Sequence, residues 1–173
     1  MRAYVLATVL FMIPALHGQP AKGDNPKRDA PFDTITLEQI KESVDNARKA
    51  GETRIDGSDN KNNRIPKGTI LCYVTSDNRY GKLEVLEYGY NLAIKWVTYA
   101  EDGRRRSGPR SRGVFSEGDR LVVRGTWPCD LDYGVVGNEG KSKPDFWWQQ
   151  VDGTVRYLVF RNGAVFTVYP PKS

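Results

Sequence analysis

Two glycine-containing turns near the end of the chain most constrain what it can fold into. Asp152-Gly153 and Asn162-Gly163 each separate runs in which apolar and polar residues alternate. Both pairs can supply the positive φ angles that a two-residue hairpin requires, and alternation places every second side chain of a strand on one face. The sequence therefore predicts antiparallel strands, the last three of which form a meander.

Similar alternating runs, separated by turn residues, begin near residue 69. In one of them Leu92, Ile94 and Trp96 share a face, which is typical of a strand with one buried side. The expected strands are 69–75, 82–88, 92–99, 120–127, 131–136, 146–151, 154–160 and 164–169. Because no helical crossover separates them, they predict a mainly β domain over residues 68–170. We expect a small antiparallel meander barrel, whose closure removes exposed edges, with a two-sheet sandwich as the alternative.

The first 18 residues have the character of a signal peptide. Charged Arg2 precedes an apolar run over residues 3–16, which is shorter than the ~20 residues of a membrane-spanning helix. Small residues near Gly18 are typical of a cleavage region. We therefore expect residues 1–18 to be removed, no membrane span, and a secreted or periplasmic protein.

Residues 19–67 are expected to form a polar leader that contains one short amphipathic helix at 37–50. Thr36 is a suitable N-cap, Gln39 completes a capping box, and Gly51 is a suitable stop. The apolar stripe of this helix must pack on something, either the domain's own sheet, which we expect, or a partner protein. The stretch 52–67 is too polar to fold by itself and predicts a surface loop.

Cys72 and Cys129 are the only cysteines. Because disulfides form in oxidising compartments, an exported chain with two cysteines in or beside strands predicts a Cys72–Cys129 disulfide bond, with two separate buried thiols as the alternative.

The sequence offers little for catalysis. His17, the only histidine, lies in the expected signal peptide, and no cofactor or metal-binding motif is present. Asp130 and Asp132 have the spacing that places two carboxylates on one face of a strand, so a carboxylate-based hydrolase is one candidate function. It is the least favoured of the three candidates. We expect a non-catalytic protein without metal or cofactor.

Two features suggest binding. The first is a set of five arginines within nine residues, able to fork onto phosphate, sulfate or carboxylate groups: Arg104, Arg105, Arg106, Arg110 and Arg112. The second is the aromatic pair Trp147-Trp148, with Tyr133 nearby in sequence. Neighbouring strand residues point to opposite faces, so at least one indole faces outward, where it serves as a platform for sugars or is covered by the N-terminal helix.

These features predict an exported binding domain for an anionic or glycan ligand. The alternative is a secreted inhibitor or protein-interaction domain that presents the arginine loop to a protein partner. A formal net charge of +5 is too mild to indicate a specific nucleic-acid binder.

Overall fold

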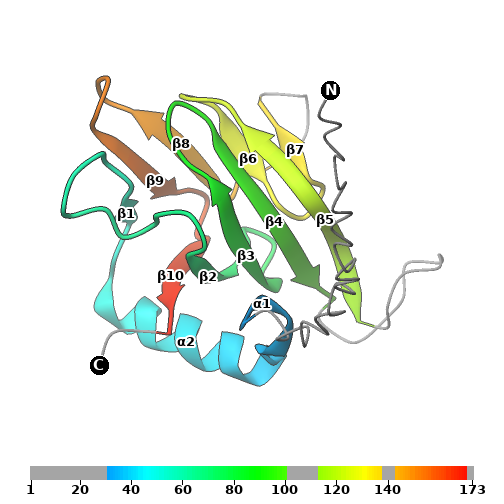
Figure 1. The fold of residues 1–173 in the computed structure, drawn as a ribbon. Helices are drawn as coiled ribbons and strands as arrows, with labels where there is room; N and C mark the ends of the chain where they lie inside the picture. Colours follow the sequence, from blue (N-terminus) through cyan, green and yellow to red (C-terminus); the bar gives the residue numbers. More distant parts are fainter. Residues whose placement is uncertain (1–30, 101–112, 138–142, 171–173) are drawn as a thin grey trace, which may run out of the picture.

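The computed structural model describes residues 31–100, 113–137 and 143–170, and these form two helices and two β-sheets (Figure 1). The helices are α1 (Pro31–Thr34) and α2 (Leu37–Ala50). The strands are β1 (Arg54–Asp56), β2 (Ile70–Val74), β3 (Tyr80–Glu87), β4 (Leu92–Tyr99), β5 (Val114–Val123), β6 (Pro128–Asp130), β7 (Val135–Val136), β8 (Phe146–Gln150), β9 (Arg156–Phe160) and β10 (Val165–Tyr169).

Each sheet contains five antiparallel strands. The first has the order β1-β9-β8-β6-β7 and the second the order β10-β2-β3-β4-β5. No ladder joins the two sheets among the described strands. The predicted mainly antiparallel β fold is therefore confirmed, and the sandwich alternative fits it, whereas the expected closed barrel is not seen.

The main core lies between the sheets. Alternating residues of the central strands point inward and are fully buried, including Leu71 and Tyr73 of β2, Ile94 of β4, and Phe146 and Trp148 of β8. This alternation is the period-2 pattern that the sequence displays, and burying one face of each sheet supplies the main stabilisation.

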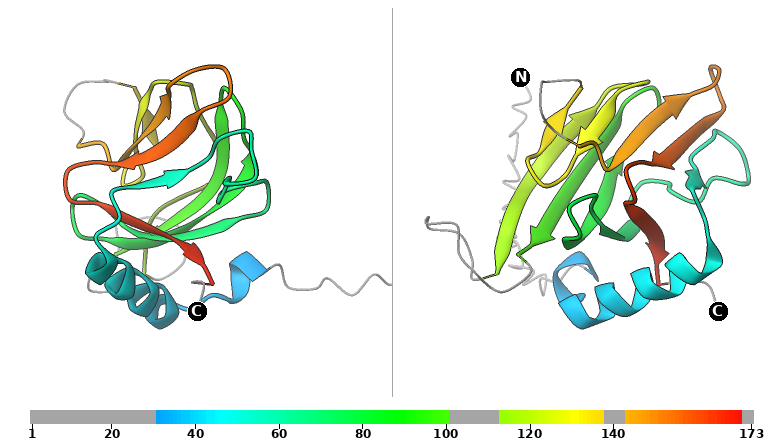
Figure 2. Two further views of the ribbon diagram at one scale, coloured as in Figure 1. Left: turned by 90° about the vertical axis from the view of Figure 1, so that its left-hand side faces the viewer. Right: turned by 180° about the vertical axis from the view of Figure 1, so that it is seen from behind.

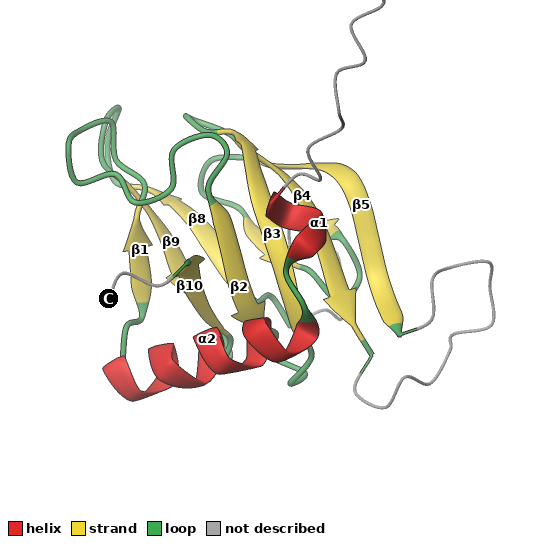
Figure 3. Cartoon of the chain, turned by 60° about the horizontal axis from the view of Figure 1, so that its bottom comes forward, coloured by secondary structure: helices red, strands yellow, loops and turns green. Residues whose placement is uncertain are grey.

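Helix α2 closes a second core on the outer side of the second sheet, where it packs against β10, β2 and β3 (Figure 3). Thr36 and Gln39 form the predicted capping box, and Gly51 ends the helix with a φ of 68°. Ile40 and Val44 are fully buried in the cluster that also holds outward residues of β2. The predicted helix and its docking on the domain's own sheet are confirmed.

The path of the last strands corrects the predicted meander. Strands β8 and β9 pair as expected across the turn that holds Asp152-Gly153, but β10 pairs with β2 in the other sheet. Asn162 and Gly163 do have positive φ angles of 50° and 82°. Their turn leads the chain from one sheet to the other, where Phe160 and Phe166 meet with ring centroids 5.4 Å apart. The Phe166 ring is fully buried in the core between the sheets, and the partly buried Phe160 ring packs against this core.

Three other segments differ from expectation. Residues 54–56, within the predicted loop 52–67, form β1 and pair with β9. The expected strand 120–127 is the end of a longer β5 that begins at Val114. The expected strand 131–136 is replaced by β6 and β7, which flank a turn at residues 131–134.

The predicted disulfide is wrong. Cys72 and Cys129 are both buried and both free. Cys72 points outward from β2 into the cluster beneath α2, whereas Cys129 belongs to the core between the sheets. Because the second sheet lies between the cluster that holds Cys72 and the cluster that holds Cys129, the two sulfur atoms cannot meet.

Candidate functional site

One outer surface of the sandwich combines aromatic rings with arginines, and we call it the aromatic face. It is the outward side of β1, β9, β8 and β6 together with the turns beside them. Its residues are Arg54, Asp56, Tyr157, Gln149, Val159, Trp147, Arg161, Pro128, Trp127 and Arg124. Neither described helix lies over β8 and β9, as both views of Figure 2 show.

Strand register aligns part of this surface in a row across the sheet. Arg54 of β1 lies opposite Val159 of β9, Val159 lies opposite Trp147 of β8, and Trp147 lies opposite Pro128 of β6. Directly opposed residues project from the same face of a sheet. With strands ~4.8 Å apart, the row spans ~14 Å, which is the scale of a short oligosaccharide.

Two shallow hollows lie at the β6 end of the row. One, of about 250 Å³, is lined by Trp147 and Arg161, and the other, of about 320 Å³, by Trp127. Both hollows are also lined by Thr126 and Pro128, so the two tryptophans are neighbours on one surface. Trp127 is 41% exposed, and an indole this exposed is available for contact with a ligand.

Alternation along β8 explains why Trp147 faces outward. Its neighbours Phe146 and Trp148 are fully buried in the core, and the Trp148 indole N–H donates to the carbonyl of Gly89 at 3.2 Å. The prediction that the two tryptophans point to opposite faces is therefore confirmed. The alternative in which the N-terminal helix covers the outward indole is wrong, because α2 packs on the other sheet.

Of the other predicted binding residues, only Tyr133 and Trp148 lie in the described part of the chain, and neither is on the aromatic face. The arginines from Arg104 to Arg112 lie outside the described residues, between Tyr99 of β4 and Val114 of β5. Tyr133 is 52% exposed and contacts Phe115 edge-on, with ring centroids 6.1 Å apart. Trp148 is in the core and presents no ring to a ligand.

Sequence reasoning missed several members of the aromatic face. Trp127 ends the expected strand 120–127, in which alternation would place it on the same face as Leu121 and Val123. The strand ends at Val123, however, and the turn that follows breaks this alternation. Arg161 adjoins the end of β9 and meets Trp147 only through the pairing of β9 with β8, whereas Arg124 meets Trp127 within the turn that follows β5.

The candidate acidic pair Asp130 and Asp132 is buried, and one oxygen of each carboxylate is held by contacts within the protein, whereas Oδ1 of Asp132 has no hydrogen-bond partner among the described residues. Asp130 accepts hydrogen bonds from the backbone N–H groups of Asp132 and Tyr133 at 3.0 and 3.2 Å, and Asp132 binds the Arg79 guanidinium at 2.7 Å. Burial raises the pKa of the Asp130 carboxyl to about 6 and also raises that of Asp132, although Arg79 opposes the second shift. These contacts are typical of carboxylates that stabilise a turn.

A third buried carboxylate joins two loops beside this pair. Asp145 accepts from the backbone N–H of Ser76 through one oxygen and from that of Leu131 through the other, each at 2.7 Å. Burial raises the pKa of the Asp145 carboxyl to about 7, because desolvation outweighs the two donated hydrogen bonds. Among the described residues no cluster of His, Cys, Asp and Glu side chains is arranged to hold a metal ion.

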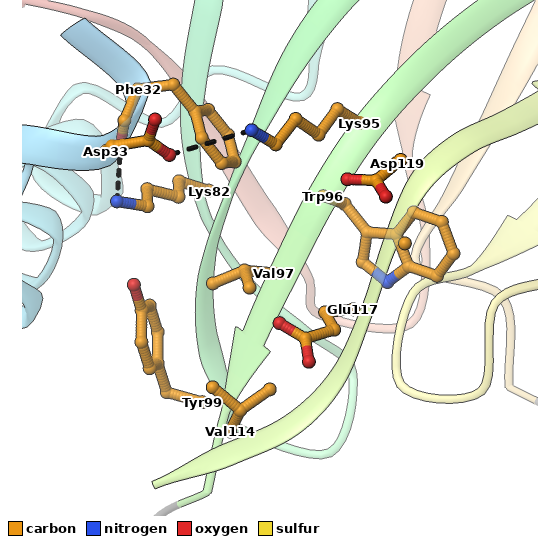
Figure 4. A pocket seen from close by; sticks show the side chains of 11 residues that line it. Phe32, Asp33, Lys82, Lys95, Trp96, Val97, Tyr99, Val114, Glu117 and Asp119 are labelled. Carbon is orange, nitrogen blue, oxygen red and sulfur yellow. Dashed lines mark hydrogen bonds and ion pairs between the residues drawn. The ribbon is translucent and has the colours of Figure 1, made fainter. Parts of the chain in front are cut away.

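A groove of about 710 Å³ lies elsewhere, between α1 and the outward side of β4 and β5 (Figure 4). Its lysines are engaged within the protein: Lys82 donates to the carbonyls of Phe32 and Ile35, and Lys95 lies 3.6 Å from Asp33. Carboxylates of β5 also line the groove. An anion would gain little there, so the groove fits the expected ligand less well than the aromatic face.

The chain matches no protein-family model, no curated protein and no solved structure. No helix within the described ranges has the length and hydropathy needed to cross a membrane.

Proposed function

We propose that this protein is an exported, non-catalytic binding domain that holds a glycan on the aromatic face. The observation that carries the proposal is the in-register row across four strands, with Trp147 in the row and Trp127 beside it. Pyranose rings carry apolar C–H faces, which pack on flat indoles while the sugar hydroxyls remain available for hydrogen bonds. A row that crosses the strands suits an extended chain better than a compact ligand.

Burial and geometry favour binding over catalysis. The carboxylates of Asp130, Asp132 and Asp145 are nearly inaccessible to solvent, and their hydrogen bonds hold turns and loops together. A glycosidase instead needs two carboxyl groups on either side of an accessible sugar. Export remains part of the proposal on the evidence of residues 1–18.

Binding measurements with a panel of soluble polysaccharides test the proposal. Isothermal titration calorimetry or affinity electrophoresis should detect binding of a glycan to the protein as it is produced, after any removal of residues 1–18. Trp147→Ala and Trp127→Ala should each weaken binding about tenfold or more, equivalent to about 1.4 kcal/mol. Tyr133→Ala, which truncates an exposed aromatic outside the aromatic face, should not weaken it.

A further set of variants tests the arginine loop. Replacing Arg104, Arg105 and Arg106 by Ser removes three charges from the segment between β4 and β5. A loss of glycan binding in this triple variant and in Tyr133→Ala, with full binding in Trp147→Ala, would move the site away from the aromatic face and refute the proposal. Absence of binding to every glycan would also refute it.

A further inference from the structure

The arginines of the described residues fall into two groups. Five pair with a carboxylate within 4.0 Å: Arg48, Arg64, Arg79, Arg120 and Arg156. The other three, Arg54, Arg124 and Arg161, have no ion pair among the described residues. All three are on the aromatic face.

Each of these three guanidinium groups lies over an aromatic ring. Arg54 lies 4.3 Å from the centroid of Tyr157 and Arg161 lies 4.8 Å from that of Trp147. Arg124 lies 5.2 Å from the Trp127 ring. A cation over a ring is attracted by the negative face of the π-system, and contact with the ring restricts the long side chain. The ring does not neutralise the charge, so the N–H groups at the edge of each guanidinium can still bind an anion.

The local charge also suits an anionic ligand. Asp56 shares the aromatic face with Tyr157, which it faces across the β1–β9 ladder. One oxygen of Asp56 accepts the backbone N–H of Ser58 at 2.8 Å, so this carboxylate already has a structural role. Against this one carboxylate the face carries three arginines that have no ion pair among the described residues, so it is cationic, whereas the other arginines of the described structure pair with carboxylates.

We propose that the ligand of the aromatic face is an acidic polysaccharide, whose carboxylate or sulfate groups bind the guanidinium groups of Arg54, Arg124 and Arg161. This inference rests on the proposed function and names its ligand class. The planar guanidinium fork matches either anion with two parallel hydrogen bonds, and a side chain already restricted by its ring loses less entropy on binding. The row across the strands sets the direction of the polysaccharide, perpendicular to β8.

The test compares two double variants that lose the same charge. Arg124→Gln with Arg161→Gln removes two arginines from the aromatic face. Arg48→Gln with Arg120→Gln removes two exposed arginines that have carboxylate partners elsewhere. Thermal unfolding of both should stay close to wild type, because exposed arginines contribute little to folding stability.

Four probes identify the ligand class: polygalacturonate, its fully methyl-esterified form, heparin and single-stranded poly(dT). We expect polygalacturonate or heparin to bind and the neutral ester to bind at least tenfold more weakly. Tighter binding of polygalacturonate than of heparin would indicate that the face recognises carboxylate groups, and the reverse order would indicate sulfate groups. The Arg124/Arg161 variant should lose at least tenfold in affinity and show a shallower salt dependence, because fewer counterions are released on binding. The Arg48/Arg120 control variant should retain the wild-type affinity and the wild-type salt dependence.

Other outcomes overturn the inference in distinguishable ways. Equal binding of the neutral ester, together with its loss in Trp147→Ala, would keep the glycan function and refute the acidic ligand. Tighter binding of poly(dT) than of any polysaccharide would assign the face to single-stranded nucleic acid. Equal losses in the two double variants would show that net charge, rather than the ring-backed arginines, drives binding. Binding to none of the probes and to no other glycan would refute the proposed function itself.

Discussion

Neutralising the carboxyl group of Asp145 should change how the stability of the protein depends on pH. Asp145 is fully buried, and burial raises the pKa of its carboxyl from 3.8 to about 7. Below pH 3.8 this carboxyl is protonated in both the folded and the unfolded chain. As the pH rises further, the unfolded chain ionises first, so its free energy falls relative to that of the folded protein. Stability is therefore lost between about pH 4 and pH 7.

The size of this effect follows from the shift in pKa. A shift of about 3 pH units, at about 1.4 kcal/mol per unit, corresponds to about 4 kcal/mol between the two ends of that window. The raised pKa of Asp130, about 6, acts in the same direction. The free energy of unfolding of the wild-type protein should therefore fall from pH 4.5 to pH 6.5. Its slope against pH should correspond to at least one proton that the folded chain binds and the unfolded chain does not.

Asp145→Asn should flatten this slope by about one proton. The amide has a single oxygen, so the backbone N–H of either Ser76 or Leu131 loses its acceptor, which costs about 1–3 kcal/mol at every pH. The variant should accordingly be less stable than wild type at pH 4.5 and should approach or exceed it at pH 7.5.

Urea unfolding at pH 4.5, 5.5, 6.5 and 7.5 measures both the slope of the free energy of unfolding against pH and the constant cost of the lost hydrogen bond. Asp119→Asn, at an exposed position on β5, serves as the control and should keep the wild-type slope. If the free energies of unfolding of Asp145→Asn and wild type run parallel from pH 4.5 to 7.5, the carboxyl is ionised throughout and the reasoning from burial is wrong.

Two further predictions concern the core. Gly81→Ala should destabilise the protein by about 1–3 kcal/mol in urea unfolding, because an added Cβ would overlap the ring of fully buried Tyr73, whereas Gly153→Ala, with nothing within 4 Å of the added atom, should have little effect. An unchanged midpoint in Gly81→Ala would contradict this packing. Cys72 and Cys129 should be unreactive toward a thiol reagent in the folded protein and should both react after unfolding without reductant; burial supports this by raising the pKa of the Cys72 thiol to about 12. Detection of no free thiol after unfolding would instead show a disulfide bond.

Local sequence patterns predicted the elements that depend on neighbouring residues. The bounds of α2 follow from its caps, which act within three or four residues. Strand β4 occupies the predicted range 92–99, and the opposite directions of Trp147 and Trp148 follow from alternation alone. The general β character and the docking of the helix could be predicted for the same reason: apolar spacing identifies the face that must be buried.

Relations between distant segments could not be predicted in this way. The pairing of β10 with β2 instead of β9, and the burial of Cys72 and Cys129 in separate clusters, depend on how two sheets stack, which local alternation does not encode. The same is true of the aromatic face. Arg54 and Trp147 are far apart in the chain and align only because both face Val159 across ladders.

The sequence by itself determined the strand periodicity, the capped helix and the opposite directions of Trp147 and Trp148, because each is set by interactions within a few residues. Only the tertiary structure decided that the Trp147 indole faces outward beside Trp127, and that three arginines without carboxylate partners among the described residues gather over aromatic rings on one face. The physical reason is that strand register and sheet packing are chosen by burial summed over the whole core, and the surface left outside follows from that choice.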